Sequence, residues 1–110
     1  MSRITLEAAR SVTGAESAPA NAESGTSTNG RRYAYATLSD VVGGDATVTL
    51  YAHVAGGKPE PIPGATLTVP AGSTEPLIVF VGTYAKVTAK VTAVVTSATV
   101  TLEADNQGPF

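Results

Sequence analysis

The chain has 110 residues and a formal net charge of −2, with nine acidic side chains, seven basic side chains and no cysteine. This length accommodates one domain, and the lack of cysteine excludes disulfides and thiolate metal sites. Ala, Thr and Val make up 47 residues while aromatic side chains account for 5%, a composition that favours β-strands and provides no dense cationic face for a nucleic acid.

The first thirty residues predict an extended N-terminal arm. Ile4 and Leu6 alternate with polar residues, which favours a short strand over a helical turn. Residues 13–30 contain no Ile, Leu, Val or aromatic side chain, so they cannot bury enough apolar surface to fold alone. We therefore divide the chain into an arm, residues 1–30, and a β-sandwich domain, residues 31–110, and expect neighbouring subunits to hold the arm in order.

Apolar and polar residues alternate with a period of two from Arg31 onward. Segments 31–38 and 46–54 each place apolar side chains on one face and polar side chains on the other, which predicts two strands. Turn-forming residues in 39–45 predict the connection between them. Residues 55–64, AGGKPEPIPG, contain three Gly and three Pro. They predict a loop, because proline lacks the N–H group that a sheet ladder needs.

The C-terminal half predicts further strands with short connections. Short strands are expected over 65–69 and 77–81. Gly82 and Thr83 suit a two-residue type II′ hairpin turn into a strand over 84–92. The apolar residues then switch from odd to even positions, which requires a turn or bulge within 93–97 before the last strand.

Six strands, or seven with the N-terminal segment, predict an all-β protein. The spacing of strands and turns indicates an antiparallel β-sandwich of jelly-roll or immunoglobulin-like type. No run approaches 18 apolar residues, so no transmembrane segment is predicted. Residues 1–10 lack the basic start and apolar run of a secretory signal. We expect neither a membrane nor a nucleic acid as a partner.

The sequence predicts no enzyme. His53 is the only histidine, on the polar face of its strand, so a metal site or a catalytic triad lacks the other side chains it needs. The glycine pairs are not followed by a helical pattern, as a phosphate-binding loop requires. All six acidic residues outside the arm are expected at turns or strand ends, where solubility alone accounts for them. We therefore expect no catalytic residue, no metal and no cofactor.

The segment 77–81, LIVFV, is apolar on both faces of its predicted strand. In a two-layer sandwich one face of a strand meets the other sheet and the opposite face meets water, so a second apolar face indicates either a covering loop or another subunit. We predict that Ile78 and Phe80 contact a neighbouring subunit, with Ile4 and Leu6 as the anchors of the arm. A homo-oligomer is expected.

Tyr33 and Tyr35 share one face of the strand over 31–38 and form a candidate ligand platform. Sugar-binding sites use aromatic rings as stacking surfaces, so a small carbohydrate-binding β-sandwich module is the alternative function. The same side chains also suit cross-strand packing with their hydroxyl groups in water. The sequence leaves both interpretations open.

The chain resembles small structural proteins of tailed bacteriophage virions, especially head-decoration and other capsid-accessory subunits. The resemblance lies in the Ala-, Gly-, Thr- and Val-rich composition, in the polar SGTSTNG segment before the first domain strand, and in the C-terminal block from VPAGSTEP to TLEAD. It implies a non-enzymatic protein of the virion, assembled in the host cytoplasm, that binds capsid or other virion proteins as a multimer. It implies no particular site residues.

Overall fold

The computed structural model describes residues 3–20, 27–53, 58–92 and 97–106. These residues form seven β-strands and no helix, which confirms the predicted all-β class. The strands are β1 (Ile4–Thr13), β2 (Tyr33–Val42), β3 (Ala46–His53), β4 (Pro59–Val69), β5 (Glu75–Phe80), β6 (Val87–Thr92) and β7 (Ser97–Asp105).

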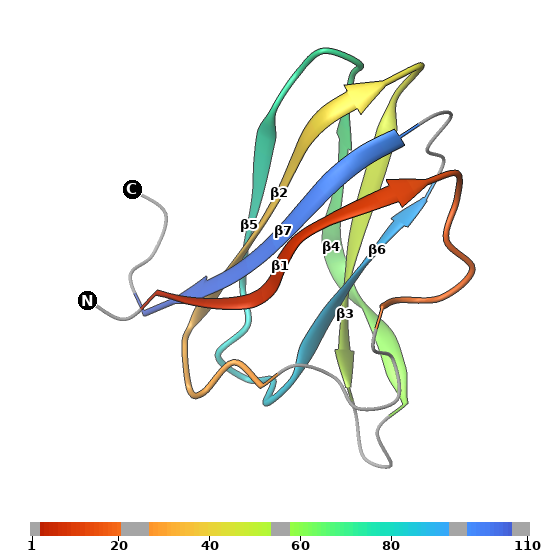
Figure 1. Ribbon diagram of the computed structural model, residues 1–110. Coiled ribbons are helices and arrows are strands. Elements are labelled where there is room, and N and C mark those ends of the chain that lie inside the picture. Colours follow the sequence, from red (N-terminus) through yellow and green to blue (C-terminus); the bar gives the residue numbers. More distant parts are fainter. Residues whose placement is uncertain (1–2, 21–26, 54–57, 93–96, 107–110) are drawn as a thin grey trace.

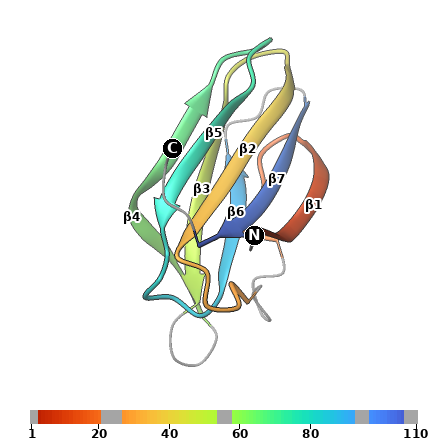
Figure 2. The same ribbon diagram turned by 90° about the vertical axis from the view of Figure 1, so that its left-hand side faces the viewer.

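The strands form two antiparallel sheets that pack face to face (Figures 1 and 2). One sheet has the order β1-β7-β2-β5 and the other has the order β4-β3-β6. The predicted β-sandwich is therefore confirmed. Its core consists of small and medium side chains, among which Leu38, Leu50 and Leu102 are fully buried. Burying an apolar side chain of this size contributes roughly 1.5–3 kcal/mol, and the alternating strands place one such face on each sheet.

The strands with strict alternation form where the sequence predicts them. Buried residues alternate with partly exposed ones along β3 from Ala46 to His53, and along most of β7. Val48 and Val100 face the core with no exposed surface. The period-two pattern thus determines both the strand and the face that it buries.

The prediction of a loop over 55–64 is wrong for the described residues 59–64, because β4 begins at Pro59. β4 is an edge strand paired only with β3. Proline at a position whose backbone nitrogen faces away from β3 removes no ladder hydrogen bond, so an edge strand tolerates it. The register shifts between Thr49 and Tyr51, opposite a bulge that contains Gly64 with φ of 77°. Ile62 in this bulge is 6% exposed and joins the core.

The hairpin predicted at Gly82 and Thr83 is also wrong. β5 pairs with β2 in one sheet, whereas β6 pairs with β3 in the other. The chain instead turns between the sheets, and the Tyr84 N–H donates to the Val81 carbonyl at 2.9 Å. The predicted turn or bulge within 93–97 falls mostly on residues outside the described ranges.

The N-terminal segment differs from the expected arm. Ile4–Thr13 forms β1 and pairs antiparallel with β7 of the same chain, from Ile4 opposite Ala104 to Thr13 opposite Ser97. The strand predicted at Ile4 and Leu6 does form, but Leu6 is buried in the core of its own chain. The structure therefore places this part of residues 1–30 within the domain.

The described parts of the polar segment that follows β1, residues 14–20 and 27–30, hydrogen-bond to β6 and to the residues just before it. Glu16 N–H donates to the Val91 carbonyl at 3.0 Å and Thr28 N–H donates to the Ala85 carbonyl at 2.9 Å. Ser27 forms an isolated bridge with Lys86. Backbone hydrogen bonds do not depend on side-chain type, which explains how a segment without large apolar residues becomes ordered on this domain.

The described residues form a sandwich with four edge strands, and three of these carry features that discourage further pairing along their length, whereas β5 has only Glu75 and Pro76 at its start. β1 has register shifts on both sides of Glu7. β4 contains Pro59, Pro61 and Pro63. β6 is covered by the segment containing Glu16 and Thr28. The fourth edge strand, β5, pairs with β2 on one side, and none of the described residues pairs with its other side.

Candidate interaction surface

Four of the residues singled out in the sequence meet on the outer face of the four-stranded sheet. The register of β2 and β5 places Tyr33 opposite Phe80 and Tyr35 opposite Ile78. Their neighbours Ala34 and Ala36 are fully buried, so these four side chains point away from the core. We call Tyr33, Tyr35, Ile78 and Phe80 the Tyr33–Phe80 patch.

Phe80 is the most exposed member of the patch. Phe80 is 52% exposed. Its ring and the Tyr33 ring pack edge to face, with 5.5 Å between their centroids and 74° between their planes. This edge-to-face geometry is favourable for aromatic pairs. A Cβ atom at Gly82 would lie 2.8 Å from the Phe80 ring. Gly82 therefore lets the ring rest against the backbone.

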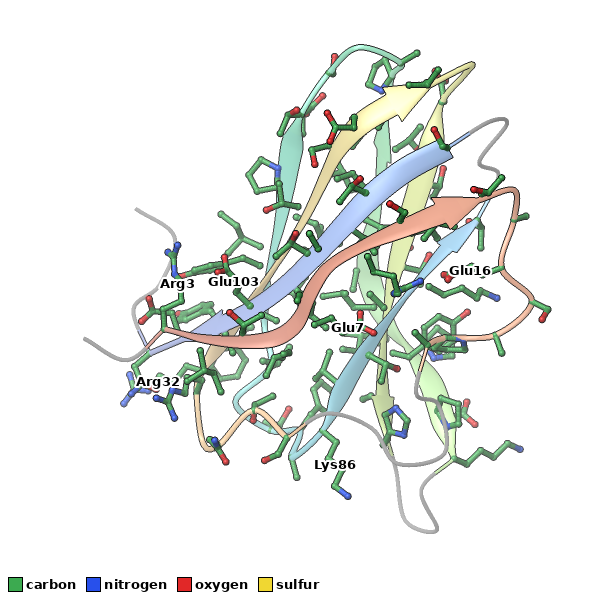
Figure 3. The ribbon with its side chains drawn as sticks, viewed as in Figure 1. Arg3, Glu7, Glu16, Arg32, Lys86 and Glu103 are labelled. Carbon is green, nitrogen blue, oxygen red and sulfur yellow. The ribbon has the colours of Figure 1, made fainter. Side chains whose placement is uncertain are left out.

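A charged side chain, Arg3, covers the Tyr35 ring and borders the patch next to β7. The Arg3 guanidinium lies 5.0 Å above the centre of the Tyr35 ring, and it contacts Asp105 at 3.4 Å and Glu103 at 3.9 Å. Figure 3 shows Arg3 and Glu103 close together at this end of the sheet. Tyr35 is 4% exposed. As a result, Tyr33 and Phe80 are the patch aromatics that reach solvent, and Tyr35 offers no open ring face to a ligand.

The other two predicted contact residues do not belong to the patch. Ile4 is partly buried and packs against the core, and Leu6 is 9% exposed within it. The reason is the pairing of β1 with β7, which turns these side chains toward the space between the sheets. The structure thus assigns Ile4 and Leu6 to their own domain instead of to a neighbouring subunit.

A buried ionic cluster that the sequence analysis missed lies where β1 faces β6. Arg10 contacts the carboxylates of Glu16 and Glu7, the latter at 3.6 Å, and donates to the Ala89 carbonyl at 3.2 Å. Glu16 also accepts the Val91 N–H at 2.7 Å. The cluster therefore joins β1, the following segment and β6. Glu7 and Arg10 stand three residues apart in the sequence, but no pattern indicated that they are buried.

Burial of the Glu7 carboxylate is the electrostatically unfavourable part of this cluster. Both of its carboxylate oxygens are buried without a hydrogen-bond donor among the described residues. Burial raises the pKa of Glu7 above its ordinary value, while Arg10 acts in the opposite direction. The raised pKa shows that desolvation outweighs the attraction to Arg10. Figure 3 shows Glu7 between β1 and β6.

The outer face of the three-stranded sheet is polar. Hydroxyl oxygens of Thr47 and Thr68 lie 3.0 Å apart, and Lys90 lies 5.4 Å from the centre of the Tyr51 ring. His53 Nε2 lies 3.0 Å from the Thr88 hydroxyl. Among the described residues no group of three or more His, Cys, Asp or Glu side chains is arranged to bind a metal ion. The described part also holds no helix long and apolar enough to cross a membrane.

Comparison with known proteins gives structural similarities only. No protein-family model matches the chain, and no curated protein matches it significantly in sequence. A subunit from a study of Bacillus endospore appendages, described as a novel family of disulfide-linked pili, aligns with 96% of this chain and 90% of its own, at 17% identity and a TM-score of 0.48. The Clostridium thermocellum xylanase 10B structure with CBM22-1 and GH10 modules and xylohexaose aligns with 97% of this chain at 16% identity and a TM-score of 0.48. This chain spans 26% of that xylanase chain.

Proposed function

We propose that this chain is a non-enzymatic structural subunit that binds neighbouring protein subunits through the Tyr33–Phe80 patch and the adjoining free side of β5. In the virion, it would decorate or stabilise the capsid. The observation that carries the proposal is the junction of an apolar patch, in which Phe80 is exposed, with an edge strand whose protective residues, Glu75 and Pro76, are confined to its start. Such a combination is typical of surfaces that bind protein.

The energetics of the patch fit repeated, individually weak contacts. Completing the burial of one Phe side chain contributes up to roughly 3 kcal/mol, a modest amount for a free complex. Copies arranged on a regular particle act together, so each contact adds to a much larger total through effective concentration. The sequence resemblance to head-decoration proteins supports a virion as that particle.

Incorporation into purified particles tests this function. Phe80 and Val42 are both 52% exposed, but Val42 lies at the end of β2 away from the patch, so Phe80→Lys and Val42→Lys form a matched pair. We expect Phe80→Lys to reduce the number of copies per particle at least ~10-fold, corresponding to ~1.4 kcal/mol per site. Val42→Lys should leave that number close to the wild-type value.

Quantitative mass spectrometry of gradient-purified particles measures the copy number, and circular dichroism checks that each variant is folded. Equal incorporation of Phe80→Lys and wild type contradicts the role of the patch. Absence of the wild-type chain from the purified particles contradicts the virion function itself.

A carbohydrate-binding function is the second candidate, because Tyr33 presents an aromatic ring beside Phe80 near the carboxylates of Glu103 and Asp105. Titration of soluble xylan, cellulose and chitin oligosaccharides, followed by a glycan array, tests it. Binding that disappears in Tyr33→Ala would favour this candidate over the subunit. Absence of binding to every oligosaccharide and to the array would remove it.

A further inference from the structure

We infer that the neighbour on β5 is a second copy of this chain, paired antiparallel through β5 about a two-fold axis with Ile78 of each copy opposite Phe80 of the other. The inference rests on the proposed function, because it uses the same contact surface, and it specifies the partner and the register. Pairing of this kind would join the two four-stranded sheets into one continuous sheet.

None of the described residues pairs with the outer edge of β5, and from Leu77 onward this edge is apolar and uncharged. β5 begins with Glu75 and Pro76, after which residues 77–81 read LIVFV, without a charged side chain or a proline. Natural proteins usually protect such an edge with Lys, Pro, a bulge or a covering loop. β4, by contrast, carries Pro59, Pro61 and Pro63 and the charged Glu60. On β5 such features are confined to Glu75 and Pro76, which leaves the stretch from Leu77 to Phe80 available for pairing.

The hydrogen bonds to β2 determine which backbone groups point outward. The Val81 N–H donates to the Arg32 carbonyl at 2.6 Å, which makes these two residues a hydrogen-bonded pair. Such pairs alternate with non-hydrogen-bonded pairs in an antiparallel ladder, so Tyr33 with Phe80 and Tyr35 with Ile78 are of the second kind. The N–H and C=O groups of Ile78 and Phe80 therefore face the free side of β5.

A two-fold axis beside Val79 satisfies all of these outward groups. It places Ile78 opposite Phe80 of the partner subunit, and each of these two residues then donates one hydrogen bond and accepts another. One alternative register, with Ile78 opposite Ile78 of the partner subunit, sets the carbonyl of Phe80 against Pro76, which has no N–H. The inferred register avoids that loss, because Pro76 then lies opposite Gly82 of the partner subunit.

Side chains on both faces agree with this register. Glu75 lies opposite Thr83 of the partner subunit, so the two Glu75 carboxylates stand at opposite ends of the paired strands and do not repel each other across the seam. On the outer face Phe80 lies beside the partner's Ile78, which extends each Tyr33–Phe80 patch into the other. Cross-strand pairs of aromatic and β-branched residues stabilise sheets.

Single cysteines test the register directly, because the natural chain contains none. In the inferred dimer Val79 faces Val79 of the partner subunit at a Cα separation of about 4.5 Å, within the range that a disulfide spans. The two copies of Ile78 are diagonal neighbours about 7–8 Å apart, outside that range. Mild oxidation of the full chain should cross-link Val79→Cys at least ~10 times faster than Ile78→Cys.

Non-reducing gel electrophoresis measures the cross-linking rate, with Thr99→Cys on the outer face of β7 as the control for random collision. Thermal unfolding checks that each cysteine variant is folded. Faster cross-linking of Ile78→Cys than of Val79→Cys would overturn the register. Rates of both that equal the rate of Thr99→Cys would overturn the pairing itself.

Sedimentation of the free chain separates this inference from the proposed function. We expect a dimer that grows with protein concentration, with a dissociation constant raised at least ~10-fold by Phe80→Lys and unchanged by Val42→Lys. A wild-type chain that stays monomeric up to millimolar concentration overturns the inference, even if Phe80→Lys still reduces incorporation into particles. A β5-paired dimer that is absent from particles leaves the inference intact and removes the virion function.

Discussion

Glu7 illustrates how one side chain ties stability to pH. Its side chain is 5% exposed and faces Arg10, yet its oxygens accept no hydrogen bond from the described residues. Because its pKa is higher in the folded state than in the unfolded state, the folded chain binds more protons at mildly acidic pH. The free energy of unfolding therefore falls as the pH rises from the unfolded pKa through the folded pKa, and this cost persists at neutral pH.

Glu7→Gln removes the buried charge and keeps the shape of the side chain. We expect the free energy of unfolding at pH 7 to stay constant or rise by about 1 kcal/mol, and its decline between acidic and neutral pH to become shallower. Urea unfolding over pH 4–8 measures both, with the more exposed Glu103→Gln as the control. A loss of stability at pH 7 with an unchanged pH profile would show that the attraction to Arg10 dominates.

At the scale of elements, the sequence predicted the strands that alternate strictly and failed where tertiary context decides. β3 and β7 follow directly from the period-two pattern. The strand expected over 65–69 is the second half of β4, but its first half, 59–64, was missed because the prolines read as a loop, and only the position of β4 at an edge makes them compatible with a strand. The docking of β1 could not be predicted, since it depends on backbone hydrogen bonds to β7 that no side chain specifies.

The candidate surface was predictable in its members but not in its arrangement. The sequence singles out Tyr33 and Tyr35 for their rings, and Ile78 and Phe80 because they are apolar on a strand face that was expected to be polar. Their proximity follows from the pairing of β2 with β5, and sequence patterns do not specify which distant strands pair. The burial of Tyr35 beneath Arg3 depends in turn on β1, whose position was unknown.

Leu6→Ala tests whether β1 belongs to its own domain. Leu6 is 9% exposed and packs in the core, so its truncation should lower the free energy of unfolding by about 2 kcal/mol in a dilute, monomeric sample. Thr5→Ala, at an exposed position on the same strand, should change it by less than ~0.5 kcal/mol. Chemical denaturation measures both. Equal stability of the two variants would indicate that β1 does not pack stably on its own domain and is an arm that neighbouring subunits hold in order.

At the scale of the whole molecule, the two sheets are held together by the apolar core and, along the flank of β1 and β6, by the ionic cluster. Arg10 contacts Glu7, Glu16 and the Ala89 carbonyl, so one side chain links both sheets and the intervening segment. Its removal would leave the Glu7 carboxylate buried without a cation. An uncompensated buried charge is among the more costly defects in a protein.

Arg10→Met should therefore lower the free energy of unfolding by about 2 kcal/mol at pH 7, a value reduced from that of a fully buried pair because Arg10 is 24% exposed. The loss should be smaller at pH 4, where protonated Glu7 no longer needs a cation, and smaller at pH 7 in the double variant Glu7→Gln with Arg10→Met. Thermal and urea unfolding at both pH values measure these differences. A loss independent of pH and of Glu7 would assign Arg10 a packing role only.

The unequal treatment of the four sandwich edges also sets a limit on polymerisation. A molecule with two unprotected sheet edges can add copies indefinitely and grow into a cross-β fibre, whereas a molecule with one such edge can pair with only one partner. The prolines of β4, the register shifts of β1 and the described residues that hydrogen-bond to β6 leave residues 77–80 of β5 as that one edge. In the inferred dimer, self-association through the strands would therefore terminate at the pair, and larger arrays would require a separate template on which the pairs are placed.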